Sequence, residues 1–500
     1  MLKNNLVFLL AILLFLPLLA ACQKSATPPQ EIRFGIAQAP LNLDPRYATD
    51  AASERVNRLI YQPLVDFDAA SKPAWRLARG DIINSLEYKF TLQKTATFHN
   101  GAALTAHDVK ATYDSLLNLK NSPHTAEFVN IDSIEVINDK TLIFKLKQTD
   151  AHFVSKLIIG ILPKSLIEQN HDFSHNPIGS GPLKFVAWQH DLKLKRISDN
   201  QTIILQEVKD PTVRVLKLRK GEIDLIQGDL PPELVKHLQE MPGILVGTGL
   251  GVNYSYLGLN MQDELLKNLK VRQAITLAID RQAIIDKVMV NRSRMAGAIL
   301  SPEHFAGNPN LTPYDYNPAL AKKLLMEAGV KLPLKLVYKT STDAFRVRLA
   351  TIMQAQMAQA GIALEIKSLD WGTFFADVKA GNFQLYGLTW VGIKTPEIYS
   401  KAFGSNYFPP NGFNRGRYSD AELDELLTQE NWLDATERIY AQLPYIPLWY
   451  EGQFAAMQKN ITNYSPKPNG NWDDLAIIER SAIIERTATI ARQPQKAQLQ

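Results

Sequence analysis

Leu334-Lys335-Leu336-Val337-Tyr338 and Ile362-Ala363-Leu364-Glu365-Ile366 are the two ends of the stretch that decides the fold of this chain. Each segment has the length and the apolar pattern of a strand. The residues between them, 346–360, have helical spacing and end at Gly361, the residue type that most often follows a helix. A strand, a helix and a second strand in succession predict an α/β protein.

The same alternation of strands and helices continues in both directions along the chain. The apolar pattern predicts strands over 31–36, 88–92 and 141–146, and helices over 51–61, 211–220 and 318–328, with one or two more over 264–289. Thr105 and Asp108 have the spacing of a helix N-cap and its acidic partner, so we expect a helix to begin there. The glycine-rich run 247–251 is expected to be a turn.

The composition is that of an ordinary globular protein with room for several domains. At roughly 150 residues per domain, a chain of 500 residues predicts about three domains. The formal net charge of +5 is small for this length and argues against nucleic-acid binding. The sequence has no HExxH motif, no GxSxG motif and no GxxxxGKS/T phosphate loop. It therefore predicts no enzyme, no metal site and no cofactor.

The N-terminal segment has the order of a secretory signal. Lys3 precedes an apolar run over 6–19, which Leu19-Ala20-Ala21-Cys22 closes. The run is shorter than the roughly 20 apolar residues of a membrane-spanning helix. Leu-Ala-Ala-Cys resembles the lipobox of bacterial lipoproteins, and Cys22 is the only cysteine of the chain. We therefore expect residues 1–21 to be a signal peptide, Cys22 to carry lipid, and residues 22–30 to be a tether.

Aromatic residues concentrate between 371 and 418, where glycine and proline are frequent. They are Trp371, Trp390, Tyr399, Phe403, Tyr407, Phe408, Phe413 and Tyr418. Aromatic side chains on segments of this composition often line a ligand cleft, and the alternative is that they pack a core. We expect them to lie in loops, with two or three facing a ligand.

A series of short strings in one order along the chain resembles the extracytoplasmic solute-binding proteins of family 5, the peptide/nickel class that serves ABC importers. The most specific string is Phe98-His99-Asn100-Gly101 followed by Leu104-Thr105-Ala106-His107-Asp108-Val109. The others are Leu43-Asp44-Pro45-Arg46, Tyr61-Gln62-Pro63-Leu64, Pro177-Ile178-Gly179-Ser180-Gly181-Pro182, Gly221-Glu222-Ile223-Asp224, Val271-Arg272-Gln273-Ala274-Ile275, Tyr316-Asn317-Pro318-Ala319 and Pro444-Tyr445-Ile446-Pro447-Leu448-Trp449.

The resemblance implies an α/β, two-lobed periplasmic-binding-protein fold of type II, in its three-domain peptide-binding variant. Domain I would combine residues 31–58, 179–256 and 459–486. Domain II would be the insertion 59–178, domain III the second lobe 257–458, and 487–500 a disordered tail. The implied protein is a monomeric receptor, tied to a membrane by lipid at Cys22. It captures a peptide-like solute and delivers it to a permease and an ATPase that are separate chains.

Two departures from the family pattern concern the ligand. Peptide-binding members use a tryptophan-centred loop whose aspartate pairs with the peptide amino terminus; here Ile393 and Thr395 hold the acidic positions. Dipeptide-binding members take the ligand carboxylate with an arginine where this chain has Lys339 and Thr340. Simple dipeptides are therefore expected to bind poorly. The expected ligand contacts are Tyr47, Lys339, Thr340, Trp371, Trp390, Gly392, Ile393, Thr395, Glu397 and Tyr399.

The sequence leaves other functions open. Nickel-binding relatives share the implied fold, so one alternative is a receptor for a non-peptide solute such as a metal chelate. Another is a lipoprotein hydrolase, and a third is a chaperone-like or signalling receptor on the same fold. The ligand, the permease and the choice of inner or outer membrane stay undecided by the sequence.

Overall fold

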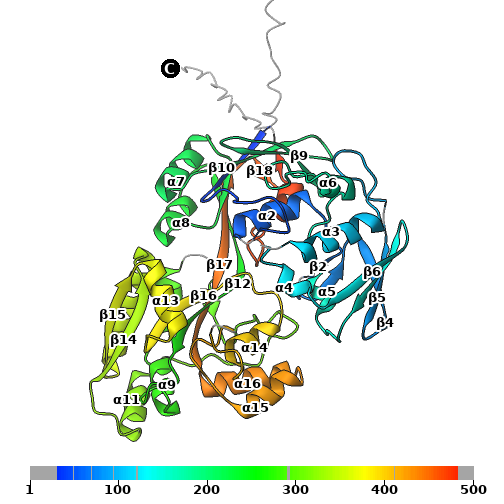
Figure 1. The fold of residues 1–500 in the computed structure, drawn as a ribbon. Coiled ribbons are helices and arrows are strands. Elements are labelled where there is room, and N and C mark those ends of the chain that lie inside the picture. Colours follow the sequence, from blue (N-terminus) through cyan, green and yellow to red (C-terminus); the bar gives the residue numbers. More distant parts are fainter. Residues whose placement is uncertain are drawn as a thin grey trace, which may run out of the picture.

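The chain folds into two lobes that share one β-sheet (Figure 1). The structure is a computed structural model that describes residues 31–481 except 49, 69, 94, 120–121, 290–292 and 410–411. The predicted signal peptide, lipid-attachment cysteine, tether and C-terminal tail lie outside the described residues. The strands follow one another across the shared sheet as β15 (Ile362–Leu369), β14 (Leu334–Ser341), β16 (Leu385–Trp390), β12 (Ile244–Leu259), β17 (Tyr445–Gln458), β11 (Leu225–Gln227), β1 (Glu31–Ile36), β10 (Thr202–Glu207), β9 (Leu192–Arg196) and β8 (Leu183–Trp188), with β13 (Arg294–Met295) beside β17.

Two long antiparallel strands, β12 and β17, connect the lobes through the middle of the molecule (Figure 1). Residues 244–249 of β12 pair with 453–458 of β17 in the first lobe, where β11 lies beside them. Residues 253–258 pair with 445–451 in the second lobe, where β16 lies beside them. The register shifts between Gly249 and Asn253, so the ladder is interrupted where the chain passes from one lobe to the other.

The turn predicted over 247–251 was wrong, because this glycine-rich run is part of strand β12. The glycines allow a close approach of two backbones rather than a reversal of the chain. A Cβ atom added to Gly251 would lie 1.6 Å from the carbonyl oxygen of Glu451 on β17. Only a residue without a side chain fits at this crossing.

The first lobe packs helices on its end of the sheet. Asp50 accepts a hydrogen bond from the Ser53 amide and begins the first of these helices, whose Val56 and Leu59 pack in one core with Phe34 of β1. This helix is α2 (Ala51–Ile60), and the other elements of the lobe outside the shared sheet are α6 (Lys164–Glu168), α7 (Pro211–Lys220), α8 (Pro232–Gln239), β18 (Ile461–Thr462), η1 (Asp473–Ala476) and β19 (Glu479–Arg480).

A smaller unit with its own hydrophobic core is inserted into the first lobe. Its four-stranded sheet has the order β4 (Ala78–Asn84), β5 (Glu87–Leu92), β7 (Thr141–Leu146) and β6 (Ile131–Asn138). Thr105 and Asp108 form the predicted capping box at the start of its main helix. The unit is completed by β2 (Val65–Phe67), β3 (Pro73–Trp75), α3 (Ala106–Asn118), α4 (Thr125–Phe128) and α5 (Phe153–Lys156).

The second lobe contains the strand–helix–strand stretch that the sequence predicts. Strands β14 and β15 are parallel neighbours joined by α12 (Ala344–Gln359), which begins at the Asp343 cap. Gly361 follows α12 with φ +78°. The other helices of this lobe are α9 (Leu269–Leu277), α10 (Arg281–Val288), α11 (Pro318–Glu327), α13 (Trp371–Ala380), α14 (Glu397–Phe403), α15 (Ala421–Thr428) and α16 (Trp432–Gln442).

Two local expectations in the second lobe need correction. The helical region begins at 269 rather than 264, because the Asn268 side chain accepts a hydrogen bond from the Lys270 amide and caps α9 there. The expectation of loops was wrong for four of the aromatic residues, because Trp371, Tyr399 and Phe403 lie in helices and Trp390 ends strand β16. None of the helices in the described part of the chain is long and apolar enough to cross a membrane.

Candidate functional site

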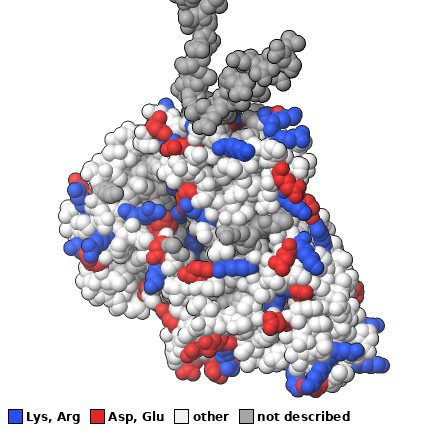
Figure 2. All heavy atoms as spheres, turned by 180° about the vertical axis from the view of Figure 1, so that it is seen from behind, with Lys and Arg blue, Asp and Glu red and all other residues white. Residues whose placement is uncertain are grey.

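The lobes meet on both sides of the strands that connect them. The Phe305 amide of the second lobe donates to the Ala70 carbonyl of the inserted unit at 3.0 Å. His152 Nε2 of the inserted unit lies 3.5 Å from Glu430 Oε1 of the second lobe. Arg348 of α12 also pairs with a carboxylate of α8 in the first lobe. Figure 2 shows that the surface is hollowed where the lobes meet, with acidic and basic side chains along its margins. We call this region the interlobe cleft.

A polar cluster lies where β12 and β17 leave the second lobe. Its members are Ser255, Arg346, Thr389 and Glu451, which we call the hinge cluster. Glu451 Oε1 accepts hydrogen bonds from the Ser255 hydroxyl at 2.7 Å, from the Thr389 hydroxyl at 3.0 Å and from Arg346 Nη2 at 3.3 Å. A cavity of about 20 Å³ adjoins it, too small for any solute. The cluster therefore fixes the second-lobe end of the crossing.

A loop after β16 contains five of the predicted ligand contacts. Trp390 ends β16 opposite Tyr254, and its indole Nε1 is buried without a hydrogen-bond partner. Gly392 turns the chain with φ +71°, and Ile393 packs partly against the aromatic core of the lobe. The Thr395 carbonyl then accepts from an amide in the first turn of α14, the helix that Glu397 begins. We call residues 390–397 the tryptophan loop.

An arginine that the sequence did not single out lies beside this loop. The Arg415 guanidinium carbon is 4.8 Å from the ring centroid of Trp390, 5.3 Å from that of Phe375 and 5.7 Å from that of Phe413. Its Nη1 donates to the Tyr256 hydroxyl at 3.2 Å. We call these five residues the arginine–aromatic stack. The sequence held one signal for this contact, because Arg415 lies within the aromatic-rich segment 371–418.

The family model of the bacterial extracellular solute-binding proteins, family 5 Middle, matches residues 80–408. The chain belongs to this family. It is similar to the oligopeptide-binding protein AppA of Bacillus subtilis, with 26% identity over 92% of this chain and 93% of that protein. It is also similar to the glutathione-binding protein GsiB of Pectobacterium atrosepticum, with 27% identity over 86% of this chain and 90% of that protein.

Solved structures of family 5 type share the two-lobed fold. The ABC transporter substrate-binding protein CtaP of Listeria monocytogenes matches 90% of this chain and 99% of its own, with 25% identity and a TM-score of 0.80. HbpA2 of Haemophilus parasuis matches 90% of this chain and 100% of its own, with 24% identity and a TM-score of 0.78. The predicted family and fold class are confirmed. Family 5 proteins are extracytoplasmic binding proteins of transport systems.

Lys339 and Thr340 occupy the place where the family resemblance implies a carboxylate-binding arginine in dipeptide-binding members. The Lys339 Nζ is 2.6 Å from Asp377 Oδ2 and also donates to the Asn382 carbonyl. This hydrogen bond from Lys339 holds the pKa of Asp377 below its ordinary value. Thr340 is fully buried. Both side chains are thus engaged within the second lobe.

The remaining predicted contacts lie in different surroundings. Tyr47 is half-buried in the first lobe, in the turn where its amide donates to the Asp44 carbonyl at 3.0 Å. Trp371 is 58% exposed and stacks on Phe375, with the ring centroids 5.4 Å apart. Tyr399 is fully buried in the second lobe, where its hydroxyl donates to the Ala306 carbonyl at 3.3 Å. Trp371 is therefore linked to the tryptophan loop by a series of contacts, in which Trp371 stacks on Phe375 and Arg415 contacts both Phe375 and Trp390. Tyr399 lies in the core.

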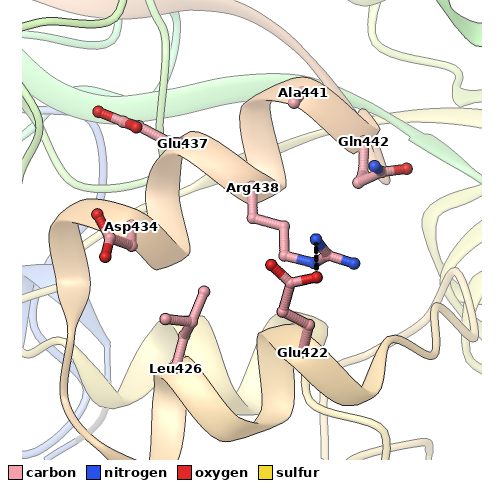
Figure 3. Close-up of a pocket in the computed structure, with 7 residues that line it drawn as sticks. All are labelled: Glu422, Leu426, Asp434, Glu437, Arg438, Ala441 and Gln442. Atoms are coloured by element: carbon pink, nitrogen blue, oxygen red, sulfur yellow. Dashed lines mark ion pairs between the residues drawn. The ribbon is translucent and has the colours of Figure 1, made fainter.

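A larger hollow of about 390 Å³ lies between α15 and α16, away from the hinge (Figure 3). Arg438 is the only cation that lines it, and its Nη1 is 2.5 Å from Glu422 Oε2. Three of the other six lining residues are acidic, and the full lining is Glu422, Leu426, Asp434, Glu437, Arg438, Ala441 and Gln442. Because its cation is already paired and the hollow belongs to one lobe, closure of the two lobes would not enclose a solute there. Within residues 31–481, as far as they are described, no group of three or more His, Cys, Asp or Glu is placed to hold a metal ion.

Proposed function

We propose that this chain is the substrate-binding component of an ABC importer, and that it captures peptide-type solutes between its two lobes. The observation that carries the proposal is the crossing of β12 and β17. The described chain passes between the lobes at these two strands, at a register shift flanked by glycines. A connection of this kind supports a hinge about which two rigid lobes close on a ligand. Peptide-type solutes are supported by the relatives whose names give oligopeptide and glutathione as ligands.

The proposed domains are domain I over 31–58, 179–256 and 459–486, of which 482–486 lie outside the described residues, the inserted domain II over 59–178, and domain III over 257–458. The strand ends 244–249 and 453–458 pair with each other in the first lobe, so we place the exact boundaries of domains I and III at the two crossings. The interruption at 249–253 in β12 and the facing residues 451–453 in β17 are the proposed hinge.

The proposed ligand contacts are the tryptophan loop and Trp371 from the second lobe, with Tyr47 from the first lobe. Lys339 already has an acidic partner, and Thr340 and Tyr399 are buried, so these three are not proposed to touch the solute. Ile393 and Thr395 stand at the acidic positions of the tryptophan loop, and Lys339 at the end of β14 is already paired with Asp377. The contacts that the resemblance implies for the two termini of a dipeptide are therefore missing. We therefore propose a preference for longer or modified peptides over simple dipeptides.

The proposed cellular setting is the extracytoplasmic face of a membrane. The receptor acts as a monomer without enzymatic activity, is held by lipid at Cys22, and serves a permease and an ATPase that are separate chains. Metabolic labelling with radioactive palmitate tests the lipid. The full-length chain should incorporate label and Cys22→Ala should not, whereas equal labelling of the two would refute lipid attachment at this residue.

Small-angle X-ray scattering of the purified protein tests the transport function. Addition of a tripeptide pool should lower the radius of gyration, because closure brings the lobes together. Native mass spectrometry of the same sample should show bound peptide. A protein that binds no peptide pool and keeps the same radius of gyration would contradict the proposed function.

A further inference from the structure

Arg415 differs from the other buried arginines of the described chain in what its guanidinium contacts. Six arginines are at least nine-tenths buried. Arg46 and Arg196 donate to carboxylates. Three more donate to backbone carbonyls at two or more points; they are Arg214, Arg272 and Arg281.

Arg415 donates only to a phenol. It is 9% exposed, its one side-chain hydrogen bond goes to the Tyr256 hydroxyl, and no acidic group among the described residues lies within ion-pair distance. A guanidinium has five N–H donors, so most of those on Arg415 have no protein acceptor. None of the Arg415 nitrogens is among the fully buried side-chain atoms without a partner in the described chain, so these donors keep some access to solvent. They are therefore available to an acceptor on a ligand.

The arginine–aromatic stack reaches the surface on the side of the tryptophan loop. Phe413 is 42% exposed, and Trp371, which stacks on Phe375, is 58% exposed. Trp390 is both a member of the stack and the first residue of the loop, and its buried indole N–H also lacks an acceptor. Two neighbouring side chains thus have unused donors beside the proposed ligand contacts.

We propose that Arg415 receives an anionic carboxylate of the solute, with the rings of Trp390 and Phe413 packing against the adjoining part of the ligand. This proposal rests on the proposed function and adds the chemical group that the solute must have, a carboxylate. A guanidinium binds a carboxylate through two parallel hydrogen bonds, and exclusion of water by the surrounding rings strengthens them. The carboxylate arises either from the C-terminus of a peptide or from an acidic side chain.

Three synthetic tripeptide pools distinguish these sources. The first has free C-termini and no Asp or Glu, the second has amidated C-termini and no Asp or Glu, and the third has amidated C-termini with one Glu. Calorimetry and native mass spectrometry of the purified protein should show binding of the first or the third pool at least about tenfold tighter than binding of the second. Arg415→Met should abolish this ratio, and Arg415→Lys should retain part of it.

Arg417→Met is the matched control, because this arginine of the same loop donates to the Ala380 carbonyl of α13 at 2.8 Å and to the Arg415 backbone carbonyl at 2.9 Å, and its guanidinium does not join the stack. It should leave the ratio unchanged, and near-ultraviolet circular dichroism checks the fold of each variant. Equal binding of the three pools, or a ratio that survives Arg415→Met, would overturn the Arg415 proposal and leave the proposed function standing. Failure of the wild-type protein to bind any pool would overturn both.

Discussion

Gly251→Ala should disturb the crossing between the lobes more than any other alanine substitution in the glycine run. The new Cβ atom would lie 1.6 Å from the Glu451 carbonyl oxygen, and real Cβ contacts are essentially never shorter than 3.0 Å. The obstacle is backbone, so a change of rotamer cannot relieve the clash and β12 must move away from β17. Overpacking of this kind costs about 1–3 kcal/mol. We expect a melting temperature several degrees lower and a shifted mean angle between the lobes.

Gly247→Ala is the matched control for this experiment. A Cβ atom at Gly247 would meet Pro466 Cδ at 3.6 Å, which is an ordinary contact, and the residue lies on the same strand. Differential scanning calorimetry and small-angle scattering should separate the two variants. If Gly251→Ala melts and scatters like wild type and like Gly247→Ala, the two strands do not approach each other as described, and the hinge argument fails.

Three further predictions concern a buried pair, a pH dependence and the ligand. Asp44→Ala should lower the free energy of unfolding by about 3–5 kcal/mol, measured by urea denaturation, because it leaves the buried Arg46 without its partner at 2.6 Å; a loss under 1 kcal/mol would contradict this. The hydrogen bond from Arg294 lowers the pKa of Glu303 to about 2, so its contribution to stability is present above the ordinary carboxyl pKa and disappears as the pH falls toward 2. The melting-temperature difference between wild type and Glu303→Gln should shrink over that range, and a constant difference would refute the assignment. Ile393→Asp should raise the affinity for unmodified dipeptides at least about tenfold in calorimetry, whereas micromolar binding by the wild type would show that the missing acidic group is not needed.

The fold was predictable where local chemistry decides it. Thr105 with Asp108 begins a helix and Gly361 ends one, because a cap and a left-handed residue act within a few positions of the chain. The βαβ order of β14, α12 and β15 follows from two strand patterns around one helical pattern.

The hinge and the arginine–aromatic stack could not be predicted in the same way. The glycine run 247–251 is typical of a turn by itself, and its role as strand depends on pairing with β17, about 200 residues further along the chain. The sequence alone indicates that the Lys339 ammonium is available to a ligand. In the structure it is paired with the Asp377 carboxylate. Arg415 lies beside Phe375 and Trp390 because distant elements pack together. Such contacts are tertiary, so no local pattern encodes them.

The distance between the two lobes, with and without solute, tests the central claim most directly. Because Cys22 is the only cysteine, a Cys22→Ala background allows two labels to be placed at new sites. Exposed Lys140 of the inserted unit and exposed Glu437 of α16 are suitable for Lys140→Cys and Glu437→Cys. Double electron–electron resonance should show a shorter and narrower distance distribution when a tripeptide pool is added. A distribution that stays the same with every pool would contradict closure of the lobes on a peptide-type solute.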